Sequence, residues 1–593
     1  MNKQEKLIAI LLGLVLAGWL WYTIADQKKQ AVAAQKAAVA AQTQQAAAPK
    51  APAAVETAKP VETAPAAPVE AAKPAKAKAP ERLETLANDQ VELVLSSRGA
   101  VVKSAKLLKY AQKTGPVSEQ NPALTLDFSA APALALEGLA GVDADEDFEI
   151  AEKGADFVLF KNAVLTRRVT LKGDYRIEVS EAFAQPDAKA ANRLSLGAVS
   201  MGASKNDILS IDSFSLAGRK PEVIHHGDNG DSPLKSYLVA MAGGCSGSKD
   251  AGSMPATSTV EYPGSQGWVA VKNRFFVSAL ASCSEPNAGF RATITRDATK
   301  RQYVLKNVAA AILFNGTAAK RDYTVYIGPK KQAFLWDLGM KDVMEFGMWR
   351  WLCYPLVWIL NFFNSLIPNY GVAIILLTIL VRLLFWPLTH KSTVGMRKMQ
   401  EIQPLVKEIQ QKYKDNPQRL QQEMMGIYRE HHVNPMSSCL PMLVQIPIFI
   451  ALFTVLRSAV ELRYAPFLWI SDLSEPEALF ASWFPFGGLN ILPLAMAGLT
   501  MLQSAFTPSG DNKQQQMMMI MMPLMMLFMF YNFPSALSLY WALSTAFGVA
   551  QAWWIKKRYG TPTAKPRVSA DGVIEADAVE LPQTRQMRRH QGQ

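Results

Sequence analysis

Five blocks of the sequence are apolar over about the length of a membrane-spanning helix, and they constrain the fold more than any other feature. They cover residues 7–25, 349–390, 437–457, 489–507 and 517–555. Because a helix needs about 20 apolar residues to cross the hydrocarbon core of a bilayer, these blocks predict a helical membrane protein. Hydrophobic residues make up only 49% of the 593-residue chain, so the remainder predicts a large polar domain outside the membrane.

The first apolar block follows the polar start "MNKQEK" and continues through the bulky Trp19 and Trp21. A cleaved signal peptide has a shorter apolar region and small residues at its exit. An uncleaved transmembrane anchor over residues 1–25 is therefore favoured over a removed signal. Residues 26–85 are rich in Ala, Pro, Lys and Glu and lack aromatic side chains, which predicts a disordered linker.

Residues 86–335 alternate apolar and polar side chains with period two, as in "DFVLF", "YRIEVSEAF" and "FRATITR". Such runs without intervening amphipathic helices predict an antiparallel β-sandwich. Cys245 and Cys283 fall in this domain, where a disulfide and two free thiols are equally compatible with an oxidising compartment. Cys353 and Cys439 lie at or in the membrane segments, and no cysteine spacing is typical of a zinc site.

After Pro329 the sequence becomes aromatic, which predicts an interfacial amphipathic helix over residues 336–367 that leads into a membrane core over 368–560. An alternative in which 349–367 is a separate span would invert everything downstream. Residues 389–436 read as a charged helical hairpin with "DNP" as its turn and Pro417 opening the second helix. Its first helix carries one apolar stripe at three- and four-residue spacing, which consists of Met396, Met399, Ile402, Val406, Ile409 and Tyr413.

The distribution of Lys and Arg predicts the orientation of this core. The hairpin carries eight of them, the stretch after Ile555 carries eight, and the loop 458–488 carries one, Arg463. The hairpin and a basic tail over 561–593 are therefore expected in the cytoplasm. Counting spans backwards places residues 26–350 outside and the N-terminus inside. The formal charge of +12 is explained by this orientation rather than by binding to DNA.

Arg382 is the one charged residue in "LLTILVRLLFWPL" (376–388). Its guanidinium stays charged, and placing it at the centre of a membrane helix costs roughly 2.5–3.5 kcal/mol. In a span that starts near Tyr370 it lies about 18 Å along the helix axis, towards the cytoplasm. One interpretation is that the side chain snorkels to the headgroups. The other is a cation in a wet cavity between helices.

The second interpretation of Arg382 is favoured because no acidic residue in the predicted core spans neutralises its charge. Thr378 lies one turn earlier on the same helical face. A cation in this setting would attract an anionic or polar group. The run "MMMIMMPLMMLFMF" (517–530) points the same way, because flexible Met side chains recur on surfaces that accept many apolar partners.

The sequence has no motif for a nucleotide, metal or haem site, and no nucleophile elbow. His431 and His432 fall in the charged hairpin and are expected to be solvated. The basic tail is compatible with a solvated charge run, with membrane lipid or with ribosomal RNA.

Several stretches resemble the YidC family of bacterial membrane protein insertases, in its Gram-negative form. They are "ILLTILVRLLFWPLTHKS", the hairpin with the span after it, and "FPSALSLYWALSTAFGVAQ". In the polar domain, "SSRGAVV", "LKGDY", "GWVAVKNRFF" and "YIGPKK" are similar to the family's periplasmic domain. The resemblance implies an N-terminal anchor and five core spans around a hydrophilic groove that opens to the cytoplasm and to lipid.

The resemblance also implies a site. The groove residues would be Arg382, Thr378, Gln445, Tyr540 and Trp541, where many members have a second Tyr in place of Trp541. A hydrophobic slide along the spans at 437–457 and 517–533 would consist of Ile446, Phe449, Ile450, Met525 and Phe528.

The implied function is that of an inner-membrane insertase and chaperone, without a catalytic residue or cofactor, and therefore not an enzyme. Its partners would be nascent membrane proteins, the Sec translocon, the ribosome and membrane lipid, with no nucleotide and no DNA. Burial of an apolar helix in lipid would supply the free energy.

Two other functions fit parts of the sequence. A transporter that binds an anionic solute at Arg382 would show broken helices in paired inverted repeats, whereas only scattered interruptions occur. A membrane-tethered module that binds a periplasmic ligand would need one anchor rather than a bundle of spans.

Overall fold

The structure is a computed structural model, and it describes residues 80–200, 209–216, 222–226, 257–296, 305–414, 416–431, 433, 440–480, 488–506, 513–559, 567–568 and 574–575. The predicted anchor, most of the predicted linker and tail, His432, Cys245 and Cys439 lie outside the described residues. The chain divides into two compact units. The description below concerns the second, Ala77–Gln593.

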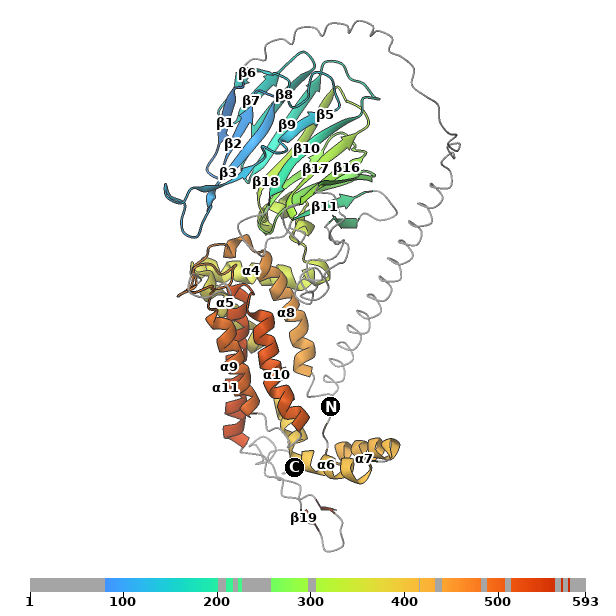
Figure 1. Cartoon of the computed structure of the whole chain (residues 1–593), viewed down its shortest axis with the longest axis vertical. Helices are drawn as coiled ribbons and strands as arrows, with labels where there is room; N and C mark the ends of the chain where they lie inside the picture. Colours follow the sequence, from blue (N-terminus) through green and yellow to red (C-terminus); the bar gives the residue numbers. More distant parts are fainter. Residues whose placement is uncertain are drawn as a thin grey trace, which may run out of the picture. The chain divides into compact units, whose positions relative to one another are not determined.

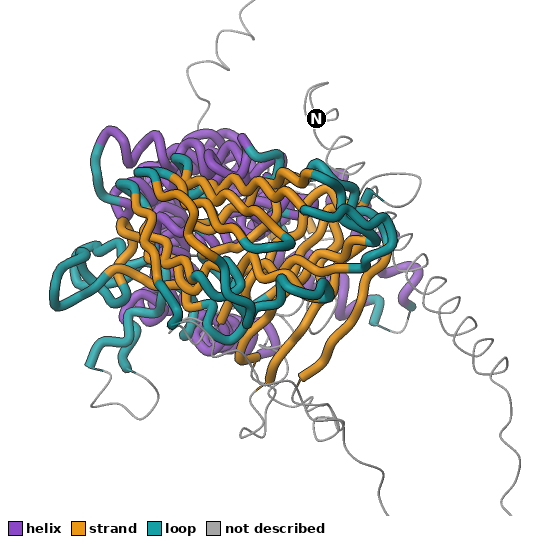
Figure 2. The backbone as a smooth tube through the Cα atoms, turned by 90° about the horizontal axis from the view of Figure 1, so that it is seen from above, coloured by secondary structure: helices purple, strands orange, loops and turns teal. Residues whose placement is uncertain are grey.

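The described residues of the polar domain form two antiparallel sheets of nine strands each (Figures 1 and 2). The first sheet contains, in spatial order, β1 (Leu83–Ala87), β2 (Val91–Ser96), β3 (Val101–Ala111), β5 (Ala133–Glu137), β10 (Asn192–Ser200), β17 (Leu305–Phe314), β16 (Gly289–Arg296) and β13 (Thr257–Pro263), with β4 (Ala123–Asp127) also paired to β3. The second contains β12 (Glu222–His226), β11 (Ser210–Ser215), β14 (Gln266–Lys272), β15 (Phe276–Cys283), β18 (Lys320–Pro329), β9 (Arg176–Phe183), β8 (Leu165–Leu171), β7 (Phe157–Lys161) and β6 (Glu149–Lys153).

The predicted antiparallel β-sandwich is confirmed, and period-two alternation explains its core. On β8 every second side chain, from Leu165 to Leu171, is buried, while those between them are exposed or half-buried. The two sheets pack against each other through β10 and β17 on one side and β11, β14 and β15 on the other. The strands begin at Leu83, inside the stretch predicted as linker, and end at Pro329. Cys283 carries a free thiol.

Three charged residues occupy inward positions on adjacent strands. Arg167 on β8 faces Glu181 on β9, which faces Arg321 on β18, and all three are fully buried. Arg167 donates to Glu181 Oε1 from Nη2 at 2.8 Å, and Tyr323 donates its hydroxyl to the same oxygen at 2.7 Å. Arg167 Nη1 also donates to the carbonyl of Leu134, on β5 of the opposite sheet, at 2.8 Å. Charges buried in this way need such pairing, and the ladder links the two sheets.

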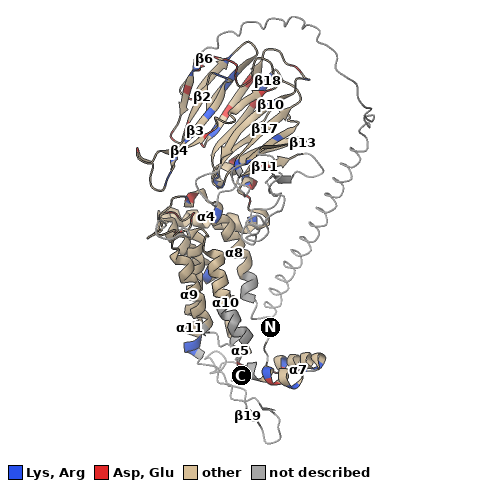
Figure 3. Ribbon diagram, in the orientation of Figure 1, with Lys and Arg blue, Asp and Glu red and all other residues tan. Residues whose placement is uncertain are grey.

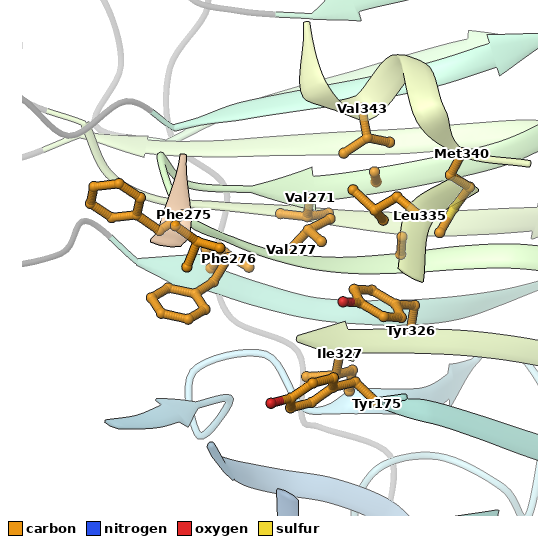
Figure 4. Close-up of a cluster of buried hydrophobic side chains, with 14 of the residues drawn as sticks. Tyr175, Val271, Phe275, Phe276, Val277, Tyr326, Ile327, Leu335, Met340 and Val343 are labelled. Atoms are coloured by element: carbon orange, nitrogen blue, oxygen red, sulfur yellow. The ribbon is translucent and has the colours of Figure 1, made fainter. Parts of the chain in front are cut away.

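The chain leaves the sandwich through short helices rather than the single interfacial helix predicted over 336–367. They are α3 (Gln332–Asp337), η1 (Lys341–Met344), η2 (Gly347–Trp349) and α4 (Arg350–Leu366). Gly339, with a φ of 70°, lies between α3 and η1, where an L-residue is strained. Leu335, Met340 and Val343 pack over Val271, Val277 and Tyr326 of the second sheet (Figure 4). The segment from α3 to η2 (332–349), called the connector below, is therefore part of the sandwich core.

A buried ion triad joins this connector to the second sheet. Lys272 at the end of β14 is 1% exposed, and its Nζ bonds Asp212 on β11 and lies 2.7 Å from Glu345 Oε1 on the connector. The same Nζ donates to the carbonyl of Val343 at 2.9 Å. Burial on its own lowers the pKa of Lys272, but the attraction of Asp212 and Glu345 outweighs it and holds that pKa above its ordinary value.

The helical part begins after α4. Its helices are α5 (Tyr370–Glu401), α6 (Gln403–Lys412), α7 (Pro417–Glu430), α8 (Leu440–Ser458), η4 (Val460–Leu462), α9 (Ile491–Phe506), α10 (Lys513–Phe530) and α11 (Ser535–Tyr559). A short ladder of β19 (Arg567–Val568) and β20 (Ile574–Glu575) follows. Among the described residues, 370–395 of α5 form the one stretch long and apolar enough to cross a membrane, and α8, α9 and α10 contain shorter apolar stretches.

The prediction that one helix carries the apolar stripe of the hairpin is wrong, because the stripe is divided between α5 and α6. α5 continues past Thr389 as far as Glu401, and α6 starts at Gln403. Pro404 lies in the first turn of α6, where its missing N–H is tolerated, whereas inside one continuous helix it would remove a backbone hydrogen bond and clash with the preceding turn. The predicted opening of the second helix at Pro417 is confirmed, with Asn416 as the N-cap residue that accepts from the backbone of Arg419.

The helices pack around α11, which contacts α5, α8 and α9, while α4 contacts α5 and α8. Lys556, Lys557 and Arg558 gather at the end of α11, shown in blue in Figure 3. At the start of α5, Gly371 lies under the ring of Phe467, a residue of the loop after α8; a Cβ on Gly371 would lie 2.1 Å from Phe467 Cγ.

The loop after α8 also contacts the sandwich. Arg274, in the turn between β14 and β15, is buried and donates to the carbonyl of Arg457 at 2.7 Å and to that of Ser474 at 2.6 Å. Its Nη1 also lies 2.6 Å from Glu475 Oε1. One arginine thus holds both ends of a loop segment.

Candidate functional site

Arg382 lies in the middle of α5 and is held by α11. Its Nε donates to the hydroxyl of Ser544 at 2.9 Å, and its Nη2 donates to the same hydroxyl at 2.5 Å and to the Ser544 carbonyl. No carboxylate pairs with it among the residues that the structure describes. The guanidinium is half-buried, so a serine rather than an acidic side chain compensates part of its desolvation.

Gln445 and Tyr540 form the second polar contact of the site. Gln445 Nε2 on α8 donates to the Tyr540 hydroxyl on α11 at 3.1 Å, and Tyr540 is buried. Since Tyr540 and Ser544 are four residues apart on α11, they lie one turn apart on one face. α11 therefore brings Arg382 of α5 and Gln445 of α8 to adjacent turns of the same helix.

Thr378 does not join this polar group through its side chain. It is fully buried, and its hydroxyl donates to the carbonyl of Ile374 one turn earlier at 2.7 Å. This contact satisfies its polar atom within α5.

A small cavity of about 70 Å³ adjoins Arg382 between α5 and α11. Its lining is apolar except at three positions, and consists of Ile379, Arg382, Leu383, Trp386, Thr389, Phe547 and Gln551. Gln551 Nε2 lies 3.5 Å from the hydroxyl of Thr389. Arg382, Thr389 and Gln551 therefore border a cavity whose surface is almost entirely apolar.

Trp541 packs into an aromatic cluster between α8, α10 and α11. Its ring centroid lies 4.8 Å from that of Phe449, edge to face, and 5.0 Å from that of Phe530. Phe449, predicted as part of the slide, thus packs inside the bundle. Such ring pairs stabilise a helix interface.

The other predicted slide residues differ in exposure. Met525 and Phe528 on α10 are 60% and 86% exposed, and Ile446 on α8 is 42% exposed. Ile450 is half-buried. Two apolar stretches on neighbouring segments of the bundle are therefore left open.

Sequence reasoning missed Ser544, Thr389 and Gln551. A serine inside an apolar helix is common, and only the packing of α5 against α11 shows that Ser544 contacts Arg382. A signal was present nonetheless, because "SLYWALSTAFGVAQ" (538–551) places Tyr540, Ser544 and Gln551 at spacings of four and seven residues, which lie on one helical face.

Comparison with known proteins agrees with this architecture. Residues 362–562 match the family model described as 60Kd inner membrane protein. Residues 84–359 match the one described as YidC periplasmic domain.

Two curated relatives are both named membrane protein insertase YidC. The protein from Prosthecochloris aestuarii is 31% identical over 511 residues, which cover 82% of this chain and 84% of the relative. The protein from Syntrophobacter fumaroxidans is 42% identical over 298 residues, 49% of this chain and 53% of the relative, so the chain spans about half the length of that relative. A solved structure titled active YidC insertase with the first transmembrane domain resolved aligns at 18% identity and a TM-score of 0.33, covering 80% of this chain and 92% of that one.

These matches give no support to the alternative of a solute transporter. They join a periplasmic domain and an inner-membrane domain in the order in which the sandwich and the helices follow one another here. The chain belongs to the YidC family of inner-membrane protein insertases.

Proposed function

We propose that this chain moves nascent transmembrane segments from the cytoplasm into the inner membrane past a polar site centred on Arg382. The observation that carries the proposal is the half-buried guanidinium on α5, held by Ser544 rather than by a carboxylate and bordering a cavity. A polar or acidic tail of an incoming chain has to cross the hydrocarbon region. A fixed cation lowers the cost of that step by attraction in a medium of low dielectric constant.

The geometry of Arg382 supports this role over snorkelling. Its Nε and Nη2 are engaged by Ser544 on the neighbouring helix, so the side chain is directed across the bundle. A guanidinium has five N–H donors, and Nη1 has no partner among the described residues. Polar groups of an incoming tail would bind there.

The apolar part of the substrate would leave along α8 and α10. The exposed Ile446, Met525 and Phe528 support such a path, while Phe449 and Trp541 would hold the wall behind it. Transfer of about 20 apolar residues into lipid supplies the free energy, and no covalent step is required.

The proposed arrangement has an N-terminal anchor and five core spans, α5, α8, α9, α10 and α11. Both termini and the α6–α7 pair would lie in the cytoplasm, and the sandwich in the periplasm. α4 would lie at the periplasmic surface, which its exposed Trp351, Trp358 and Phe362 support. Ribosome and Sec translocon are proposed partners of the cytoplasmic and membrane faces.

Site-specific crosslinking tests the substrate path. A photoreactive residue at Leu383, which lines the cavity and is 64% exposed, is compared with one at Leu384, which is 69% exposed but outside the cavity lining. Thr378 is not used as a crosslinking position because its side chain is buried. Ribosome-stalled chains of a small membrane protein should crosslink at Leu383 once their first apolar segment emerges, and weakly at Leu384. Equal crosslinking at both positions, or none at Leu383, would contradict the proposed path.

Charge dependence tests the role of Arg382. Insertion of a substrate with an acidic N-terminal tail is compared with that of the same substrate with a neutral tail. Arg382→Ala should impair the acidic substrate far more, and Arg382→Lys should retain part of the activity because the charge remains. Ser544→Ala serves as a matched control that keeps the charge but removes one partner. Equal losses of insertion activity for the two substrates in Arg382→Ala would show that Arg382 only stabilises the fold and does not attract the acidic tail.

A further inference from the structure

The loop between α8 and α9 contains a tight turn with an unusual tip. Phe467 and Ile470 form an isolated antiparallel bridge, with N–H to carbonyl distances of 2.9 Å and 2.8 Å in the two directions. Both side chains are buried. The two residues between them, Leu468 and Trp469, are 74% and 47% exposed. The turn therefore hides its base and presents two large apolar side chains to the surroundings.

The residue types at this tip are poorly suited to a turn in water. Leu468 has a φ of 52°, in the left-handed region that Gly and Asn enter readily and Leu does not. Two-residue turns of this kind usually carry Asn or Gly. The chain thus combines backbone strain with apolar exposure, and neither stabilises the loop itself.

The base of the turn is firmly held, so its tip has a defined position. Asp472 Oδ1 accepts from the backbone N–H of Tyr464 at 3.0 Å and from that of Ser474 at 2.8 Å. The backbone N–H of Leu473 donates to the carbonyl of Ala465 at 3.1 Å. These bonds close the loop on both sides of the turn.

The position of the turn points to the lipid surface. Phe467 packs directly on Gly371, in the first turn of α5. Residues 370–395 have a mean hydropathy of 2.3 and the length of a membrane span. The tip that follows Phe467 is therefore attached where an apolar helix begins. Trp is enriched at this depth of a bilayer, where its ring meets the headgroups.

We propose that Leu468 and Trp469 insert into the headgroup–acyl boundary of the leaflet at the start of α5 and act as an interfacial anchor. The ligand is the phospholipid surface itself. This explains why a Leu with a strained backbone lies at the tip, because moving its apolar side chain from water into lipid supplies free energy that the fold itself does not. The inference rests on α5 being a membrane span and does not depend on insertase activity.

The same loop contacts the sandwich, so the anchor would fix more than the turn. Arg463 Nη1 donates to the carbonyl of Ala111 at the end of β3, and the Tyr464 hydroxyl donates to that of Gln112, each at 2.9 Å. A tip inserted in lipid thereby restrains the height of the sandwich above the membrane.

Spin labels in the full chain in phospholipid vesicles test the proposal. The four natural cysteines are replaced by Ser, and single labels are attached through Leu468→Cys or Trp469→Cys. Ser471→Cys, exposed on the same loop, and Glu119→Cys, exposed in the sandwich, are the controls. The relaxation of each label is measured with oxygen, which concentrates in lipid, and with a water-soluble nickel chelate.

Oxygen should relax both tip labels more strongly than the nickel chelate does. The label at Glu119 should show the reverse, and the ratio for the label at Ser471 should lie between these two. Two tip labels as accessible to nickel as Glu119 would overturn the proposal. Leu468→Cys replaces an exposed side chain, whereas Trp469→Cys also removes a hydrogen bond to the buried Glu477, so the insertion activity of each labelled chain is measured in parallel. Oxygen-shifted tips in a chain without insertion activity refute the proposed function alone, whereas nickel-accessible tips in an active chain refute this inference alone.

Discussion

Replacing Lys272 by Met tests whether the buried triad holds the connector on the sandwich. Lys272 is 1% exposed, and its carboxylate partners Asp212 and Glu345 come from β11 and the connector. Met has a similar length and fills the space without a charge. The substitution leaves Asp212, fully buried, and Glu345 without their cation.

The expected loss follows from the burial of the pair. Removing one partner of a buried ion pair typically costs about 3–5 kcal/mol, because the remaining charge is left uncompensated. For a domain of this size, roughly 2–4 °C of melting temperature corresponds to each kcal/mol. The Lys272→Met chain should therefore melt about 6–20 °C below the parent, by those same conversions.

The pH dependence of this loss has a definite sign. The pKa of Lys272 is raised in the folded chain, so its contribution is fully present below about pH 10.4 and is lost only as the pH rises through the folded-state pKa. In Lys272→Met, the carboxylate of Asp212 takes up a proton more readily when folded than when unfolded. The variant should therefore gain stability relative to the parent as the pH falls from 8 to 5.

Thermal unfolding in detergent at one scan rate, followed with a dye that reports exposed apolar surface, measures both effects. Asp212→Asn in the Lys272→Met background is the control, because it removes the uncompensated charge and should restore most of the loss. A single variant that melts within about 2 °C of the parent, well under the cost of breaking a buried pair, would refute the reasoning. So would a loss that does not change with pH.

Three further predictions follow from contacts described above. Gly371→Ala brings a Cβ to 2.1 Å from Phe467 Cγ and should destabilise the helical part by about 1–3 kcal/mol, seen as a lower melting temperature; unchanged melting would contradict the packing. Arg274→Ala removes the bonds to Arg457 and Ser474 and should speed protease cleavage within the loop between α8 and α9, mapped by mass spectrometry, with the exposed Arg168→Ala as the control. Burial raises the pKa of the Cys283 thiol, so its alkylation should be slow at pH 7.5 and still be accelerating above pH 9; a plateau below pH 8.5 would oppose this.

Much of the sandwich could be predicted from the sequence because alternation is a local signal. Leu165, Val169 and Leu171 recur every second or fourth residue, and this places them on one face of a strand. The same spacing places Arg167 inwards, but its partner Glu181 is fixed by the register of β8 with β9. Register depends on pairing between strands, which one sequence does not reveal.

The helices were predictable as apolar stretches, but their ends and contacts were less so. Apolar length predicts α5, whereas its end at Glu401 depends on Pro404, which interrupts an apolar stripe that continues beyond it. Arg382 stands out as a charge among apolar residues, but Ser544 becomes visible only when α5 and α11 are packed together. The resemblance assigns Trp541 to the groove, and only the packing of α8 against α11 shows that its ring lies against Phe449.

The strand order gives the sandwich unequal resistance to pulling at its two ends. The chain enters through β1, at the edge of the first sheet, and leaves through β18, which pairs on both sides, with β15 and β9. Tension applied through the chain before Leu83 can peel one strand from a single neighbour. Tension applied through the connector after Pro329 loads a strand held by two ladders at once. Mechanical work done on the membrane helices would thus be transmitted into the body of the sandwich, while strain from the other end would be released at its edge.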